Sequence, residues 1–96
     1  MAAPTIEDLP YFLEQSSRLY DKYIDLKAQL RQPQDEFDRA EIWGKIEENS
    51  QEIDTLFIKY RTLYNLPREL LTPFESAITD MVIKFSKMQA LSMGLD

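Results

Sequence analysis

The segment between Pro33 and Pro67 constrains the fold more than any other part of the sequence, because it contains one glycine and no proline. Its apolar side chains recur at steps of three and four residues, which places them on one broad face of an α-helix. They are Ile42, Trp43, Ile46, Ile53, Leu56, Phe57, Tyr60, Leu63 and Tyr64. A helix over 34–65 would be about 45 Å long, too long for a single short neighbour to cover. We therefore predict that it is the spine of a small helical bundle.

A second amphipathic segment precedes Pro33. Asp8 can cap its start, and Pro10 falls in the first helical turn, where no amide donor is required. Pro33 ends the segment, because the residue before a proline disfavours helical geometry. Its apolar positions, with Ser16 at the one polar step, are Leu9, Phe12, Leu19, Tyr23, Leu26 and Leu30. The pattern predicts a helix over 8–31.

A third helix is predicted over 73–93. The sequence Thr72-Pro73-Phe74-Glu75 has the form of a capping box, in which a threonine and a glutamate side chain each accept a hydrogen bond from the other's backbone amide. Gly94 is placed to end the helix in a left-handed C-cap, with Leu95 folding back. The apolar face comprises Phe74, Ile78, Met81, Phe85 and Met88.

Short connections make successive helices antiparallel neighbours. We predict an all-α, antiparallel three-helix bundle that forms a single domain, with a flexible N-terminus at 1–7 and a connector at 66–72. The long helix over 34–65 is expected to pack against both of the others, with Ser16 facing Ser50. The alternative is an extended hairpin of the first two helices, with the third helix docked on a partner or on a second copy of the chain.

The absence of cysteine and histidine from the 96 residues excludes several classes of chemistry. It rules out disulfides, thiolate and imidazole metal ligation, cysteine or serine–histidine nucleophiles, and histidine acid–base catalysis. We expect no enzymatic activity, no cofactor and no metal. No window is apolar enough for a membrane span, and the N-terminus lacks the features of a signal peptide. We therefore expect a soluble, intracellular (cytoplasmic) protein, with signal-less export or incorporation into a particle as alternatives.

The formal net charge of −6 is confined to one stretch of the chain. Residues 35–54 contain eight acidic side chains and two basic ones, whereas the charges of the remaining residues balance. The acidic residues are Asp35, Glu36, Asp38, Glu41, Glu47, Glu48, Glu52 and Asp54. This charge argues against nucleic acid and anionic membrane as direct partners. It suits either a solvated face near the positive end of the helix dipole or a surface that docks on a basic partner.

Apolar residues outside the main stripes indicate more hydrophobic surface than a small monomer needs. We therefore predict a non-enzymatic protein–protein interaction module, such as an adaptor, a chaperone or an assembly subunit. It would bind another protein, or its own copy, through apolar residues of the second and third helices: Ile58, Leu63, Ile83, Met88, Leu91 and Met93. The alternative is an acidic inhibitor that occupies the basic site of a nucleic-acid-binding protein, using the eight acidic residues of 35–54 in place of phosphates.

Overall fold

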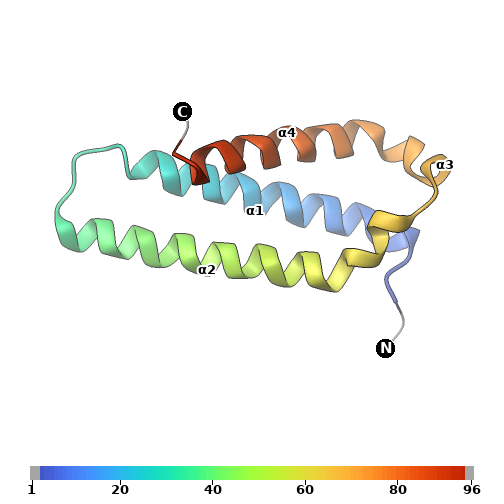
Figure 1. The fold of residues 1–96 in the computed structure, drawn as a ribbon, viewed down its shortest axis with the longest axis horizontal. Coiled ribbons are helices and arrows are strands. Elements are labelled where there is room, and N and C mark those ends of the chain that lie inside the picture. Colours follow the sequence, from blue (N-terminus) through green and yellow to red (C-terminus); the bar gives the residue numbers. More distant parts are fainter. Residues whose placement is uncertain (1–2, 95–96) are drawn as a thin grey trace.

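The structure, a computed structural model, describes residues 3–94 and confirms the prediction of an all-α, antiparallel three-helix bundle (Figure 1). Three long helices account for most of these residues: α1, Leu9–Gln29; α2, Glu36–Tyr60; and α4, Glu75–Ser92. Shorter elements complete the chain: the 3-10 turn η1, Ile6–Asp8; the 3-10 segment η2, Arg61–Asn65; the single turn α3, Arg68–Leu71; and the 3-10 turn η3, Thr72–Phe74. The bundle measures 49 × 29 × 18 Å along its principal axes.

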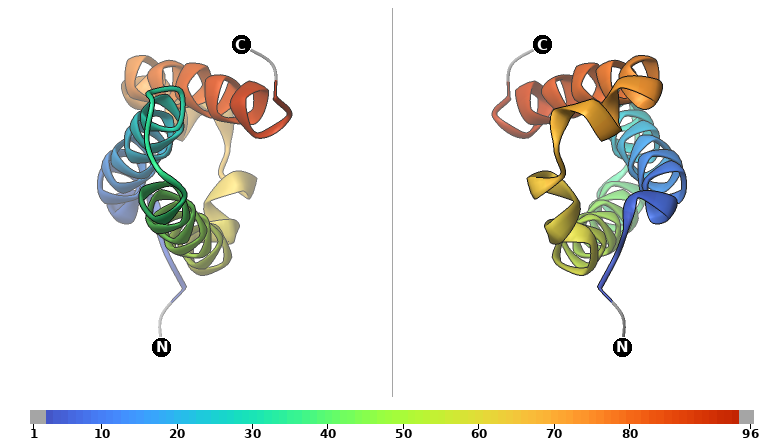
Figure 2. Two further views of the ribbon diagram at one scale, coloured as in Figure 1. Left: turned by 90° about the vertical axis from the view of Figure 1, so that its left-hand side faces the viewer. Right: turned by 90° about the vertical axis from the view of Figure 1, so that its right-hand side faces the viewer.

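The central helix of the bundle is α1. It packs along both α2 and α4, whereas the backbones of α2 and α4 scarcely approach each other. The end-on views of Figure 2 show α2 and α4 on two different sides of α1, with η2 and α3 passing from one to the other at one end. The prediction that the helix over 34–65 packs between the other two was therefore wrong. The docking of α4 on α1 of the same chain corresponds to the bundle and not to the alternative hairpin.

The central place of α1 follows from the width of its apolar face. α1 buries two adjoining stripes of side chains, whereas α2 buries only one narrow stripe. The buried residues of α1 are Leu9, Phe12, Leu13, Ser16, Leu19, Tyr20, Tyr23 and Leu26, and those of α2 are Ile46, Asn49, Ile53 and Tyr60. A helix with two apolar stripes can cover two neighbours at once.

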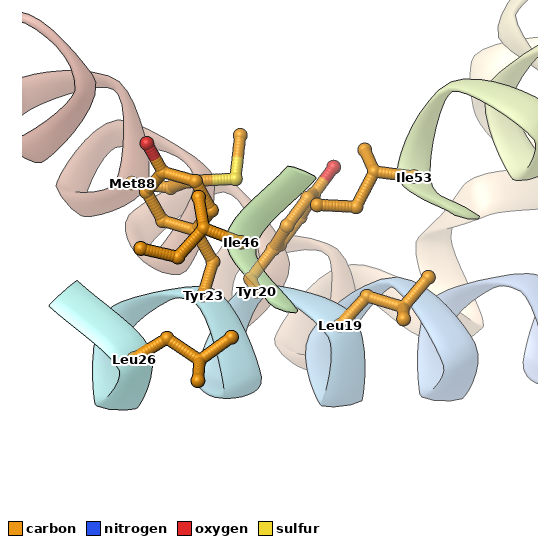
Figure 3. Packing of buried hydrophobic residues seen from close by; sticks show 7 residues of the cluster. All are labelled: Leu19, Tyr20, Tyr23, Leu26, Ile46, Ile53 and Met88. Carbon is orange, nitrogen blue, oxygen red and sulfur yellow. The ribbon is translucent and has the colours of Figure 1, made fainter. Parts of the chain in front are cut away.

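The core consists of two hydrophobic clusters placed one after the other along α1. The first gathers side chains from all three long helices, and Figure 3 shows Met88 of α4 beside Tyr23 and Ile46. The second joins the start of α1 to the end of α2 and to η2, with Phe12 at 5.5 Å from Tyr60 between ring centroids. Together they exclude water from the whole α1 face.

The observed α1–α2 interface differs from the predicted one in its buried polar residue. Asn49 is fully buried and donates from Nδ2 to the backbone oxygen of Leu19 at 3.2 Å. Ser16 is buried as well, but Ser50, its predicted partner, is only half-buried. Positions 49 and 50 are both one helical step from Ile46 and Ile53, so spacing alone does not choose between them. The Asn49 Oδ1 and Ser16 Oγ atoms are buried without a hydrogen-bond partner.

The observed helix caps agree with the caps predicted from the sequence only in part. Asp35 caps α2, because its Oδ1 accepts from the Asp38 amide at 2.8 Å. Gly94 has a φ of +78°, which confirms the predicted left-handed C-cap, while Leu95 lies outside the described residues. The predicted capping box of the third helix was wrong. The 3-10 turn η3 comes before α4, and the Thr72 hydroxyl donates to the Arg68 carbonyl at 3.4 Å.

At the first helix, Asp8 does not cap α1 as predicted. Its carboxylate instead accepts from the Thr5 amide at 2.8 Å and so closes the preceding turn η1. Pro10 does lie in the first turn of α1, where it removes no helical hydrogen bond.

We predict opposite outcomes for two substitutions at Asn49. Asn49→Leu removes a buried carbonyl oxygen that has no partner, and the Leu19 carbonyl keeps its helical bond, so stability should stay within about 1 kcal/mol of the parent. Asn49→Asp places an unpaired charge in the core and should cost about 3–5 kcal/mol at neutral pH. Urea unfolding followed by circular dichroism measures both values.

The pH dependence of the aspartate variant provides the control. Burial raises the pKa of an unpaired carboxyl in the folded state. The loss of stability caused by Asn49→Asp should therefore be complete at neutral pH and should shrink as the pH falls toward the aspartate pKa of the unfolded state, about 3.9. An Asn49→Asp variant as stable as the parent at neutral pH would show that this position is hydrated and not buried.

Candidate functional site

The structure describes the side chains of residues 3–94. No group of three or more acidic side chains there is placed to hold a metal ion. None of the helices in this range is both long and apolar enough to cross a membrane. The feature that remains is a surface shaped by the packing of the three helices.

A groove runs between α2 and α4 on the side opposite α1, and we call it the α2–α4 groove. Two cavities lie along it, one helical turn apart on each of the three helices. The larger, about 250 Å³, is lined by Tyr20, Phe57, Tyr64, Met81, Val82 and Phe85. The smaller, about 120 Å³, is lined by Tyr23, Ser50, Ile53, Asp54, Met88 and Ser92.

The floor of the groove is formed by two tyrosines of α1. Figure 3 shows the rings of Tyr20 and Tyr23 standing away from α1, with their hydroxyl ends pointing away from that helix. The ring of Tyr20 contacts Phe57 of α2 and Phe85 of α4, with centroids 6.2 and 5.6 Å apart. The Phe57 and Phe85 rings lie 6.2 Å apart, so the two walls of the groove meet through aromatic side chains.

The rim of the groove keeps apolar groups in contact with solvent. Val82 on α4 is 50% exposed, and Tyr64 at the end of η2 is 57% exposed. On α2, Trp43 lies two seven-residue steps before Phe57, with Ser50 between them, so all three share one side of the helix. Seven-residue spacing on one helix face is typical of helices that pack against another helix.

The structure divides the predicted apolar contact residues into two sets. Ile58, Ile83 and Met93 are exposed, as a binding surface requires. Leu63 and Met88 are buried within the chain and Leu91 is half-buried against the core, although Met88 also lines the smaller cavity of the groove.

The groove itself was not predicted from the sequence. Phe57 and Phe85 lie at core spacing, and both pack against the core as this spacing predicts. Together with Val82 they also line the larger cavity on the open side of the bundle. The seven-residue repeat from Trp43 to Tyr64 was the available signal, because it continues one line of large side chains past the face that α1 covers.

All eight predicted acidic residues are exposed, but they do not form one face. Asp54 lines the α2–α4 groove, and Glu47 lies seven residues before it on the same side of α2. Glu48 and Glu52 lie on the other flank, in a cavity of about 470 Å³ between α1 and α2. Of the remaining four, Asp35 caps α2 and Glu41 pairs with Lys45 at 4.0 Å.

The opposite seam, between α1 and α4, is closed by a polar cluster around Lys84. Its Nζ donates to the Ser17 hydroxyl at 2.7 Å and to the Asp21 carboxylate at 2.9 Å, and lies 3.4 Å from Asp80. The hydrogen bond to Asp21 raises the pKa of Lys84 and keeps it charged. Within residues 3–94, no ion pair joins α2 to α4.

The tyrosines of the groove sit in a poorly hydrated environment. Burial raises the pKa of Tyr20, and the nearby Tyr64 raises it further. Burial also raises the pKa of Tyr23 and Tyr64. The phenols therefore stay neutral over the whole physiological range, and the groove floor is apolar with a few hydroxyl groups.

Comparisons of the chain with protein-family models, with curated proteins and with solved structures found no match.

We predict that the stability of the bundle falls as the pH rises above about 10. The folded pKa of Tyr20 lies above its unfolded value of 10.0, so its contribution is complete below that value and is lost as the pH rises further. Tyr20→Phe keeps the ring and removes the titrating group. The loss of stability between a pH just below 10 and a pH just above 10 should therefore be smaller for this variant than for the parent. Chemical unfolding at the two pH values measures the difference.

Tyr11→Phe is the matched control, because Tyr11 is exposed and lies outside the groove. It should retain the pH dependence of the parent. If Tyr20→Phe and the parent lose the same stability, the Tyr20 hydroxyl is solvated in the folded state.

Proposed function

We propose that this chain is a non-enzymatic protein-interaction module whose α2–α4 groove takes the apolar face of a helix from another chain. The observation that carries the proposal is the groove itself. Its floor and walls come from all three long helices, its lining is aromatic and aliphatic, and its rim leaves Val82 and Tyr64 in contact with solvent.

The arrangement of the helices supports a helical ligand. In a closed three-helix bundle every helix packs closely on the other two, but here the backbones of α2 and α4 both lie along α1 and scarcely approach each other. Helices in contact lie about 8–10 Å apart, and a wider pair leaves a trough along its length. An amphipathic helix lying in such a trough would complete a four-helix arrangement, and helix-in-groove binding of this kind recurs among peptide-recognition domains.

The chemistry of the lining supports binding more than catalysis. The groove contains phenols, a thioether pair (Met81 and Met88) and one carboxylate, Asp54. Methionine side chains are flexible and polarizable, which lets one surface fit different apolar ligands. Adaptors, chaperones and assembly subunits all use surfaces of this type.

The hypothesis of an acidic inhibitor receives less support. A surface that imitates a phosphate backbone presents its charges along one face, whereas the acidic residues of 35–54 are spread over both flanks of α2. We therefore place the interaction in the groove and not on the acidic surface as a whole.

Two adjacent residues of α4 test the proposal. Val82 lines the groove, whereas Ile83 lies outside its lining, and both are well exposed, at 50% and 62%. A designed amphipathic peptide with leucines at i, i+3, i+4 and i+7 would be titrated into isotope-labelled protein and followed by nuclear magnetic resonance. We expect saturable shifts at Val82, Phe85 and Tyr64.

Val82→Asp should weaken binding of this peptide at least about tenfold, because it places a charge in the apolar contact. Ile83→Asp is the matched control and should bind like the parent. Shifts centred on the Ile83 side of α4, or a peptide that does not bind the parent, would contradict the proposed site.

A further inference from the structure

The two walls of the α2–α4 groove differ in charge. On α4 the groove is lined by Met81, Val82, Phe85, Met88 and Ser92, and none of these residues is charged. On α2 the lining includes one carboxylate, Asp54, and Glu47 lies seven residues before it on the same side of the helix. Arg61 continues this line at the far end, where η2 begins.

The two acids are available to a ligand. Both are exposed, and within the described part of the chain neither forms an ion pair. Asp54 flanks Tyr23 and Ile53 at the end of the groove where α4 finishes with Ser92, and Glu47 lies about two helical turns beyond it. The charged groups of the groove edge therefore lie on α2, acidic at this end, which gives the apolar groove a defined polarity across its width.

We infer that the occupant of the α2–α4 groove is an amphipathic α-helix of another protein that carries lysine or arginine along the edge facing α2. This inference rests on the proposed function of the groove and adds the chemistry of its ligand. The groove line on α2 runs from Ser50 to Tyr64, about 20 Å, so a ligand helix of about 14 residues would fill it. Its apolar face would meet Phe57 and Phe85, and its basic edge would meet Glu47 and Asp54.

A second copy of this chain is a poor occupant on electrostatic grounds. Each copy has a net charge of −6, and all of this charge comes from residues 35–54 at the start of α2. A two-fold contact whose axis runs across the groove would place each α2 against its own counterpart, which brings Glu47 and Asp54 toward the carboxylates of the other copy. Like charges placed opposite each other oppose association, whereas a basic helix would gain from the same groups.

The test compares two designed peptides with the same apolar face, one with lysines and one with glutamates along the edge. Binding to the full chain would be measured by fluorescence anisotropy at low and at moderate salt. We expect the lysine peptide to bind about five- to tenfold more tightly at low salt, and the preference to shrink at moderate salt because these rim charges are exposed to solvent.

Paired neutral variants locate the effect. Glu47→Gln together with Asp54→Asn should remove most of the preference for the lysine peptide. Glu48→Gln together with Glu52→Gln changes the same number of charges on the other flank of α2, in the cavity against α1, and should leave the preference nearly unchanged.

The outcomes separate this inference from the proposed function. Equal binding of both peptides, or loss of the preference only in the Glu48 and Glu52 variant, overturns the inference and leaves the groove as a helix-binding site. Failure of both peptides to bind overturns the proposed function as well. A dimer of the free chain in light scattering that dissociates in Val82→Asp shows that a second copy fills the groove, which also overturns the inference.

Discussion

The rest of the structure depends on the two adjoining apolar stripes of α1. Phe12 packs on Tyr60 of α2, while Tyr20 packs on both Phe57 of α2 and Phe85 of α4. Each stripe needs a cover, and because the stripes adjoin on one helix, α2 and α4 are both held on α1 at an angle to each other. Their separation therefore follows from the width of the α1 face, while ring contacts such as Phe57–Phe85 connect their side chains. The groove is the geometric consequence of that width.

Aromatic side chains connect α2 and α4, whose backbones scarcely approach each other. Phe57 reaches from α2 to rings on every neighbouring element, with centroid distances of 6.2 Å to Phe12, Tyr20 and Phe85 and 6.3 Å to Tyr64. Aromatic pairs at such distances contribute about 0.5–1.5 kcal/mol each beyond their buried area. The same rings that hold α2 and α4 together thus line the proposed binding surface, so stability and recognition share one cluster of residues.

The sequence predicts the helices of this protein better than their arrangement. The prolines, Gly94 and the apolar spacing within each segment were sufficient to place all three long helices and their antiparallel order. Spacing alone does not reveal which helix is central, because the segments 8–31 and 34–65 both carry broad apolar faces, and only packing shows that α1 covers two neighbours. For the same reason, spacing predicted Ser50, and not Asn49, as the polar residue of α2 that faces α1. Spacing also did not reveal that Phe57 and Phe85 line a groove, because a half-buried groove residue has the same spacing as a fully buried one.

The distribution of polar contacts indicates how the groove can receive a ligand without disturbing the fold. The α1–α4 seam is held by Lys84 with Ser17, Asp21 and Asp80, and the α1–α2 seam contains the Asn49–Leu19 hydrogen bond. Between α2 and α4, in residues 3–94, the structure has ring contacts but no hydrogen bond or ion pair. A helix entering the groove therefore has to displace water and adjust side chains such as Val82 and Met81, but it breaks no polar link between helices. Because an unmade buried hydrogen bond costs about 1–3 kcal/mol, the absence of such a link keeps the cost of opening this side of the bundle low.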